Sequence, residues 1–131
     1  MIADSIAKYL QSLNVGKINK DIFIDFQPDE PDDCITIYNG SAPVLEESNG
    51  LNIDNAGIQI LIRDNNYNNA KLKAQNIYSY LIALSGDIEG SLITFIEIET
   101  YPQSLGKDEK SRNEFSMYFN VRYENLTLNR I

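Results

Sequence analysis

The sequence predicts a single α+β domain over residues 1–131, in which a mostly antiparallel, mixed sheet of about five strands is covered by two main helices. Two segments place apolar residues at steps of three and four, which is the spacing of an amphipathic helix. Several others alternate apolar and polar residues, or are rich in Ile, Thr and Phe, which is typical of strands. One helix precedes the strands and the second lies among them, an order that favours an α+β sandwich.

The chain is predicted to begin with a helix followed by a strand. Apolar residues from Ile2 to Leu13 recur on one helical face, and Asn14 and Gly16 are expected to end the helix. Residues 21–26 then alternate apolar and acidic or aromatic side chains, which predicts a half-buried strand.

An acidic turn and a second strand follow. Residues 27–33 contain two prolines and four carboxylates, so they cannot continue a strand and are expected to form a solvated turn. Residues 34–39 are predicted to form the second strand. Cys34 is the sole cysteine, so it forms no internal disulfide, and its apolar neighbours favour a small buried side chain.

The middle of the chain is predicted to form a long loop, a strand and the main helix. Residues 41–55 are rich in Ser, Asn and Gly and predict a loop that is longer than most connections. Residues 56–63 alternate around three isoleucines and predict a central strand. Residues 64–66 supply helix caps, and helical spacing then continues from 67 to 84, where Gly86 follows.

The last third is predicted to form two strands joined by a polar turn. Residues 92–101 are rich in Ile, Thr and Phe, and residues 102–112 begin with a proline and form the turn. Strict alternation from Phe115 to Tyr123 is the clearest strand pattern in the sequence.

Charge and composition exclude several functions. The net charge is −8 and the pI is about 4.4, which disfavours sequence-specific binding of nucleic acid. Residues 1–55 hold ten acids and three bases, so most of the excess lies there. The chain contains no histidine, which removes His-based nucleophile activation and His-ligated zinc. No apolar run approaches a membrane span, and we expect no membrane association and a cytoplasmic origin.

The remaining candidates for chemistry are weak, so we predict no enzymatic activity, no cofactor and no metal. No glycine-rich phosphate loop occurs. Glu97 and Glu99 lie two apart on a predicted strand, so they share an exposed face rather than acting as an acid and base. The spacing of the carboxylates in the acidic turn does not match a calcium loop. These carboxylates are Asp29, Glu30, Asp32 and Asp33.

Several segments together resemble a known family. They are the run 58–64 with its following helix, the turn from Tyr101 to Glu109, the strand from Arg112 to Phe119, and the opening helix with segment 31–38. In order and spacing this arrangement is similar to the tail terminator or minor capsid proteins of long-tailed, siphovirus-type phages and prophages.

The resemblance implies a structural role at the head–tail joint. The family forms a ring, commonly a hexamer, on the last ring of the tail tube; it ends tube growth and meets a head-completion or connector protein. The protein would assemble in the host cytoplasm and remain in the virion. Ring closure requires two different patches on each subunit. We expect these in two turns, with candidates Arg63, Asp64, Tyr67, Gly106, Lys107, Asp108, Glu109 and Arg112.

Two further hypotheses remain open. The acidic turn, Asp29, Glu30, Asp32 and Asp33, is a candidate for the ring lumen, where repulsion lets DNA pass without adhesion. It is equally a candidate patch of an acidic binding module, an adaptor or inhibitor that engages a basic protein. A third possibility, a histidine-free enzyme that uses carboxylates or tyrosine, has the least support.

Overall fold

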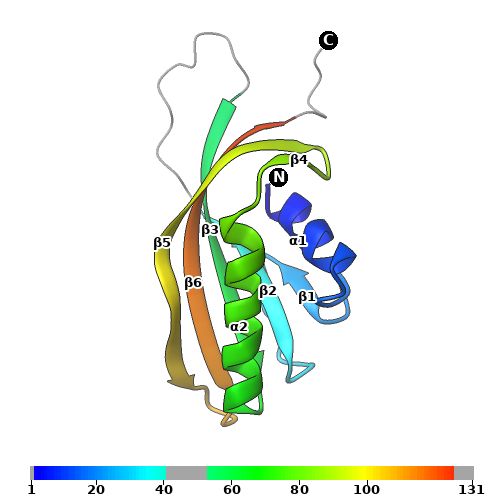
Figure 1. The fold of residues 1–131 in the computed structure, drawn as a ribbon. Helices are drawn as coiled ribbons and strands as arrows, with labels where there is room; N and C mark the ends of the chain where they lie inside the picture. Colours follow the sequence, from blue (N-terminus) through cyan, green and yellow to red (C-terminus); the bar gives the residue numbers. More distant parts are fainter. Residues whose placement is uncertain (1, 41–52, 126–131) are drawn as a thin grey trace.

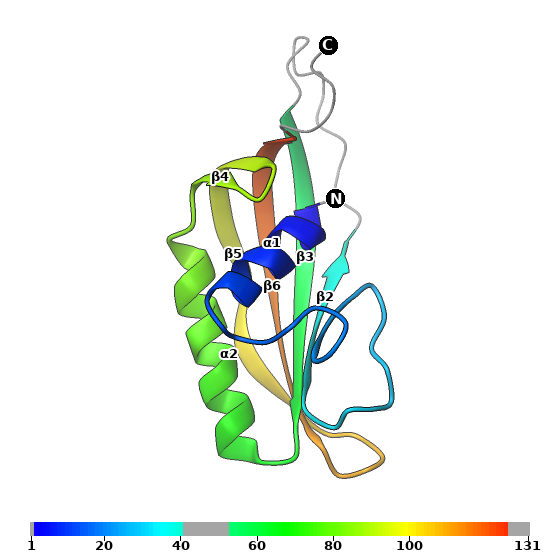
Figure 2. The ribbon, with the colours of Figure 1, turned by 90° about the vertical axis from the view of Figure 1, so that its right-hand side faces the viewer.

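The computed structural model describes residues 2–40 and 53–125, which form two helices and a six-stranded mixed sheet. The strands lie in the order β1-β2-β3-β6-β5-β4, and both helices cover the same face of the sheet (Figures 1 and 2). The elements are α1 (Ile2–Ser12), β1 (Ile22–Ile24), β2 (Cys34–Asn39), β3 (Ile53–Asp64), α2 (Tyr67–Ile82), β4 (Gly86–Ile88), β5 (Ser91–Lys107) and β6 (Asn113–Asn125).

The fold confirms the predicted α+β class with two helices, whereas the predicted number of strands was one too low. The missed strand, β4, has only three residues and begins at Gly86 (φ 99°), so it is too short to show alternation. The predicted loop at about 41–55 lies outside the described residues except for its last three residues, which belong to β3.

Both helices pack through the residues that the spacing predicted. In α1, Ile2, Ile6 and Leu10 are buried, and the chain leaves the helix at Asn14, which adopts a left-handed φ of 62°. In α2, Asn66 caps the first turn by accepting a hydrogen bond from the Asn69 amide at 2.9 Å. Its buried face consists of small and aliphatic side chains, Ala70, Ala74, Ile77 and Leu81.

The centre of the sheet is the antiparallel pair of β3 and β6. Ile58, Ile60 and Ile62 of β3 lie opposite Phe119, Met117 and Phe115 of β6, and all six are buried under the helices. This confirms the alternation predicted for both strands. Cys34 is buried as expected, and burial raises the pKa of its thiol.

The first strand pair differs from a simple hairpin. β1 runs parallel to β2, with Ile22 beside Ile35, so the chain must cross over before it pairs again. β1 is also shorter than the predicted 21–26, because Asp25 adopts a positive φ of 63° and ends it. The connection formed by residues 25–33 carries the acidic turn.

β5 corrects the prediction of a strand over 92–101 and a turn over 102–112. The strand continues to Lys107, and the turn is confined to residues 108–112. β4 pairs only with Ser91–Ile93, so among the described strands β5 has one neighbour over the rest of its length. A proline is tolerated on such an edge, and Pro102 coincides with one of four register shifts against β6.

Candidate functional site

The predicted interface residues and the acidic turn come together at one end of the molecule. β3 ends there, β6 begins there, and the connection 25–33 lies beside the β5–β6 turn (Figure 2). We call this region the braced end; it comprises residues 27–33, 63–65 and 108–113. The sequence patterns indicated the acids and the arginines of this region as separate candidates. In the structure they form one network of hydrogen bonds and ion pairs.

Arg63 binds the backbone of the acidic turn. Its side chain is nearly fully buried, with the residue 2% exposed. Nη2 donates to the carbonyl oxygens of Pro31 at 2.6 Å, Pro28 at 2.8 Å and Asp29 at 3.3 Å, and Nε donates to that of Asp32 at 3.0 Å. Because the guanidinium donates to four carbonyl groups of the turn, it holds the turn in its curved path.

Arg112 links the acidic turn to the β5–β6 turn. The two oxygens of Asp108 accept from its amide and from Nε, both at 2.9 Å. Nη1 donates to the Asp29 carbonyl at 2.6 Å and to the Asp32 carboxylate at 3.2 Å, and Nη2 lies 3.3 Å from the Asp29 carboxylate. The Arg112 side chain is 5% exposed, so this ion-pair network is largely shielded on the arginine side.

The carboxylates around Arg112 are shifted toward the ionised form. The pKa of Asp29 is lowered chiefly by its hydrogen bond from Lys110, and that of Asp32 by hydrogen bonds from Asn65 and then Arg112. Burial acts to raise the pKa of Asp108, but the hydrogen bonds from Arg112 outweigh it and lower the pKa. The Asp29 and Asp32 side chains are 62% and 43% exposed, so these two charges still face solvent.

A second set of contacts ties the start of α2 to the same end. The Asn65 amide donates to Asp33 at 3.1 Å, and the Asn113 side chain donates to the Asn65 carbonyl at 3.1 Å. Asp64 is buried and accepts from Lys73 at 3.2 Å. The turn before α2 is therefore fixed to both the acidic turn and β6.

The predicted interface residues thus divide into two groups. Arg63, Asp64 and Arg112 are buried and brace the fold together with Asp108, which is half-buried and paired with Arg112. The exposed group comprises Tyr67, Gly106, Lys107 and Glu109. Tyr67 also contacts Phe115, with ring centroids 5.4 Å apart. Only the exposed group can meet a partner without rearrangement, together with the outward carboxylates of the acidic turn.

A hollow of about 350 Å³ opens at the braced end. Arg63, Lys110 and Arg112 line it together with Asp29, Asp108 and Glu114. Lys110 and Arg112 are paired with acids, and Arg63 donates to backbone carbonyls. In the part of the chain that the structure describes, no group of three or more His, Cys, Asp or Glu side chains could hold a metal ion. The charges that line this hollow hold the acidic turn and the β5–β6 turn together.

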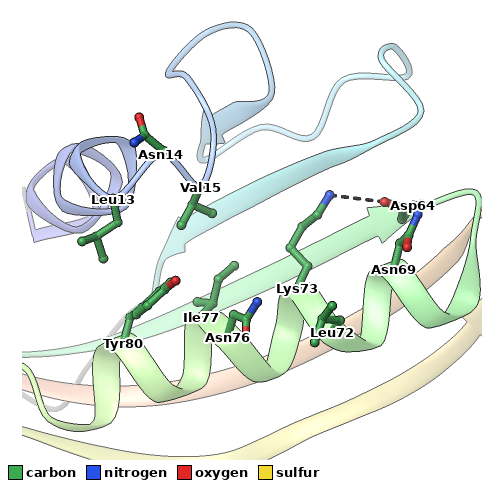
Figure 3. A pocket seen from close by; sticks show the side chains of 10 residues that line it. All are labelled: Leu13, Asn14, Val15, Asp64, Asn69, Leu72, Lys73, Asn76, Ile77 and Tyr80. Carbon is green, nitrogen blue, oxygen red and sulfur yellow. Dashed lines mark hydrogen bonds and ion pairs between the residues drawn. The ribbon is translucent and has the colours of Figure 1, made fainter.

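A second hollow was not predicted from the sequence. It has a volume of about 390 Å³ and lies between α2 and the end of α1 (Figure 3). Leu13 and Val15 face it from the α1 side, and Asn69, Lys73, Asn76 and Tyr80 face it from α2 (Figure 3). We call this hollow the helix groove. The exposed Leu72 on α2, which the buried-face pattern does not explain, was the available signal.

Comparison with protein families decides between the functional hypotheses. The sequence model of a family described as bacteriophage tail terminator protein matches residues 9–125, a span that contains α2 and all six strands. The chain belongs to the bacteriophage tail terminator family. No curated protein sequence matches it.

As a tail terminator, the protein has a structural role in completing the phage tail. Such proteins are incorporated in the virion and are normally not enzymes. Neither described helix is long and apolar enough to span a bilayer.

Proposed function

We propose that this tail terminator forms a homo-oligomeric ring, a hexamer, that caps the tail tube, ends its growth and provides the head–tail joining interface. The family match over residues 9–125 carries this proposal. Its partners are other copies of itself, the tail tube protein and a head-completion or connector protein. Assembly takes place in the host cytoplasm, before the ring becomes part of the virion.

The braced end supports the proposal because it presents an ordered polar surface. Glu109 is exposed on the β5–β6 turn, whose base is held by Arg112, and Gly106 and Lys107 are exposed at the adjoining end of β5. A preorganised surface loses less conformational entropy on binding than a free loop does. We therefore assign the exposed members of this end to contacts with the tube or the connector, and Arg63 and Arg112 to holding them in place.

The acidic turn is assigned to the lumen of the ring. The side chains of Asp29 and Asp32 remain about half exposed, and Glu30 is exposed beside them. Carboxylates repel the phosphate backbone, so DNA would pass without adhering. The assignment predicts that Glu30→Lys rings retain DNA in a filter-binding assay at low salt, whereas rings with Asp21→Lys, changed on another loop, do not.

The test is tube growth in the presence of the protein. Purified tail tube protein is polymerised alone and with the tail terminator, and tube lengths are measured by negative-stain electron microscopy. We expect shorter tubes of limited length with a ring of extra density at one end. Tubes that grow equally long and carry no cap would overturn the proposal, and capture of a basic protein by a small soluble species would favour an acidic adaptor.

A further inference from the structure

Two surfaces of this chain carry opposite charge although the protein as a whole is acidic. Residues 2–21 and α2 hold five lysines and two acids, Asp4 and Asp21, a net charge of +3. The five lysines are Lys8, Lys17, Lys20, Lys71 and Lys73. Residues 83–107 hold four acids and one base, Lys107, a net charge of −3. These acids are Asp87, Glu89, Glu97 and Glu99, and all four are exposed.

The acidic segment is also an open sheet edge. Within the described part of the chain, β4 covers β5 only at Ser91–Ile93, so residues 94–107 have no strand on their outer side. Three large apolar side chains are exposed along this stretch: Phe95 is 54%, Tyr101 64% and Leu105 51% exposed. We call residues 94–107 the free edge. Exposed apolar groups on an unpaired edge are typical of a surface that another chain covers.

The basic surface contains the helix groove. Its walls expose apolar groups, with Leu13, Leu72 and Tyr80 37%, 57% and 38% exposed. Lys73 lies in the groove, where Asp64 pairs with it, while Lys8, Lys17 and Lys20 lie on the α1 side of the molecule and are exposed. The groove combines apolar area with one internal ion pair, and exposed lysines lie close to its lining in the chain, Lys71 next to Leu72 and Lys17 two residues after Val15. These lysines are complementary in charge to an acidic, apolar edge.

The groove and the free edge lie on opposite flanks of α2. Asn69, Lys73, Asn76 and Tyr80 face the groove, whereas Tyr78 is on the other flank and contacts Tyr101 of β5 with ring centroids 5.7 Å apart. β5 accordingly runs on the side of α2 that faces away from α1 (Figures 1 and 3). One copy cannot insert its own edge into its own groove, so the complementary surfaces can meet only between copies.

We infer that the free edge of one copy docks against the helix groove of the next copy, with Phe95, Tyr101 and Leu105 covered and the acids of residues 83–107 facing the lysines of the helix side. The inference rests on the proposed ring, for which it names the two patches. A contact between two different patches is heterologous, and repeated around an axis it closes a ring.

The test uses two variants whose changes lie at exposed positions. The groove variant, Leu72→Glu with Asn76→Glu, places acids opposite an acidic edge. The edge variant, Glu97→Lys with Leu105→Lys, places bases opposite a basic helix side. Tyr118→Lys, on the face of the sheet without helices where Tyr118 is 43% exposed, is the matched control.

Assembly is measured by light scattering and native mass spectrometry, both free and on tail tubes. Each variant alone should need about a hundredfold higher concentration to form the oligomer, because like charges then face each other. An equimolar mixture of the two variants should assemble at the concentration that the parent needs. The basic edge of one variant then faces the acidic groove of the other, and the unchanged edge faces the unchanged groove, so the oligomer should contain both chains in alternation. The Tyr118→Lys protein should assemble like the parent.

The outcomes separate this inference from the proposed function. If the parent protein forms rings and both variants also form them, the rings use other surfaces and the inference is wrong, while the proposed function stands. If both variants fail and the mixture fails too, the groove and edge do not face each other and the inference is again wrong. If the parent neither forms rings nor caps tubes, the proposed function itself is overturned. Circular dichroism of each variant checks that its fold is intact.

Discussion

The braced end and the free edge show two ways in which this fold treats polar and apolar groups at its periphery. At the braced end, arginines are buried and carboxylates are held by hydrogen bonds from the same chain. Along the free edge, large apolar side chains are exposed and the strand lacks an outer neighbour among the described residues. The arginines of the braced end have their hydrogen-bond partners within one subunit. The apolar side chains of the free edge are covered only when a second copy docks, as we infer above. Stability and assembly should therefore depend on different residues.

The largest effect is expected at Arg63. Replacement by Met removes the donors to four carbonyl groups, and we expect the free energy of unfolding to fall by about 3 kcal/mol. This free energy is measured by urea denaturation, with circular dichroism as the signal for unfolding. Lys107→Met, at an exposed position, serves as the control and should change stability by less than about 0.5 kcal/mol. Equal effects at the two positions would contradict a bracing role for Arg63.

Arg112→Lys should have a smaller effect. Lysine keeps the charge but cannot donate to Asp108, Asp29 and Asp32 in the same plane, so we expect a loss of about 1–2 kcal/mol. Lys110→Ala breaks an ion pair in which both side chains are more than half exposed, so its effect on the free energy of unfolding should be smaller than that of Arg112→Lys. A larger loss for Lys110→Ala than for Arg112→Lys would show that the shielded network is not what holds the turns together.

Acid should remove the stability that the carboxylates of the braced end contribute. The pKa values of Asp29, Asp32 and Asp108 are lowered in the folded state from an ordinary value of 3.8. A lowered folded pKa contributes stability above the ordinary pKa, and this contribution disappears as the pH falls through the folded pKa. Urea midpoints should therefore be steady from pH 7 to about 5 and fall below about 4.

Asp108→Asn provides the control for that pH dependence. The amide keeps an oxygen that accepts from Arg112 but does not titrate in this range. The variant should start with a lower midpoint at pH 6 and lose less of it on acidification than the parent. A parallel loss in parent and variant would show that other carboxylates govern the acid response.

The elements that were predicted well are those in which local pattern and tertiary environment agree. β3, β6 and the helices bury one face, so their periodicity reports the core directly. β5 was cut short at Pro102 because a proline usually ends a strand, whereas on an edge it needs no second neighbour. β4 is held by its pairing with β5 rather than by its own sequence.

The candidate site was only partly predictable for a related reason. The residue types at the turns marked Arg63, Asp108 and Arg112 as candidates, but not their partners. The contact between Arg112 and Asp29 joins residues 83 positions apart, and that between Arg63 and Asp32 joins residues 31 apart. No local spacing encodes such contacts. The helix groove was missed because it is formed by α1 and α2 together.

The smallest effect on stability is expected at the free edge. Leu105 is half exposed, so Leu105→Ser should change the free energy of unfolding of the monomer by less than about 0.5 kcal/mol. The same change removes apolar area from the proposed contact between copies, so the apparent mass at a given concentration should fall, as measured by light scattering. Arg63→Met, studied below its unfolding midpoint, should show the reverse, with lower stability and unchanged assembly per folded subunit. If Leu105→Ser destabilised the monomer and left assembly unchanged, the free edge would stabilise the fold of the single subunit and would not be a contact surface between copies.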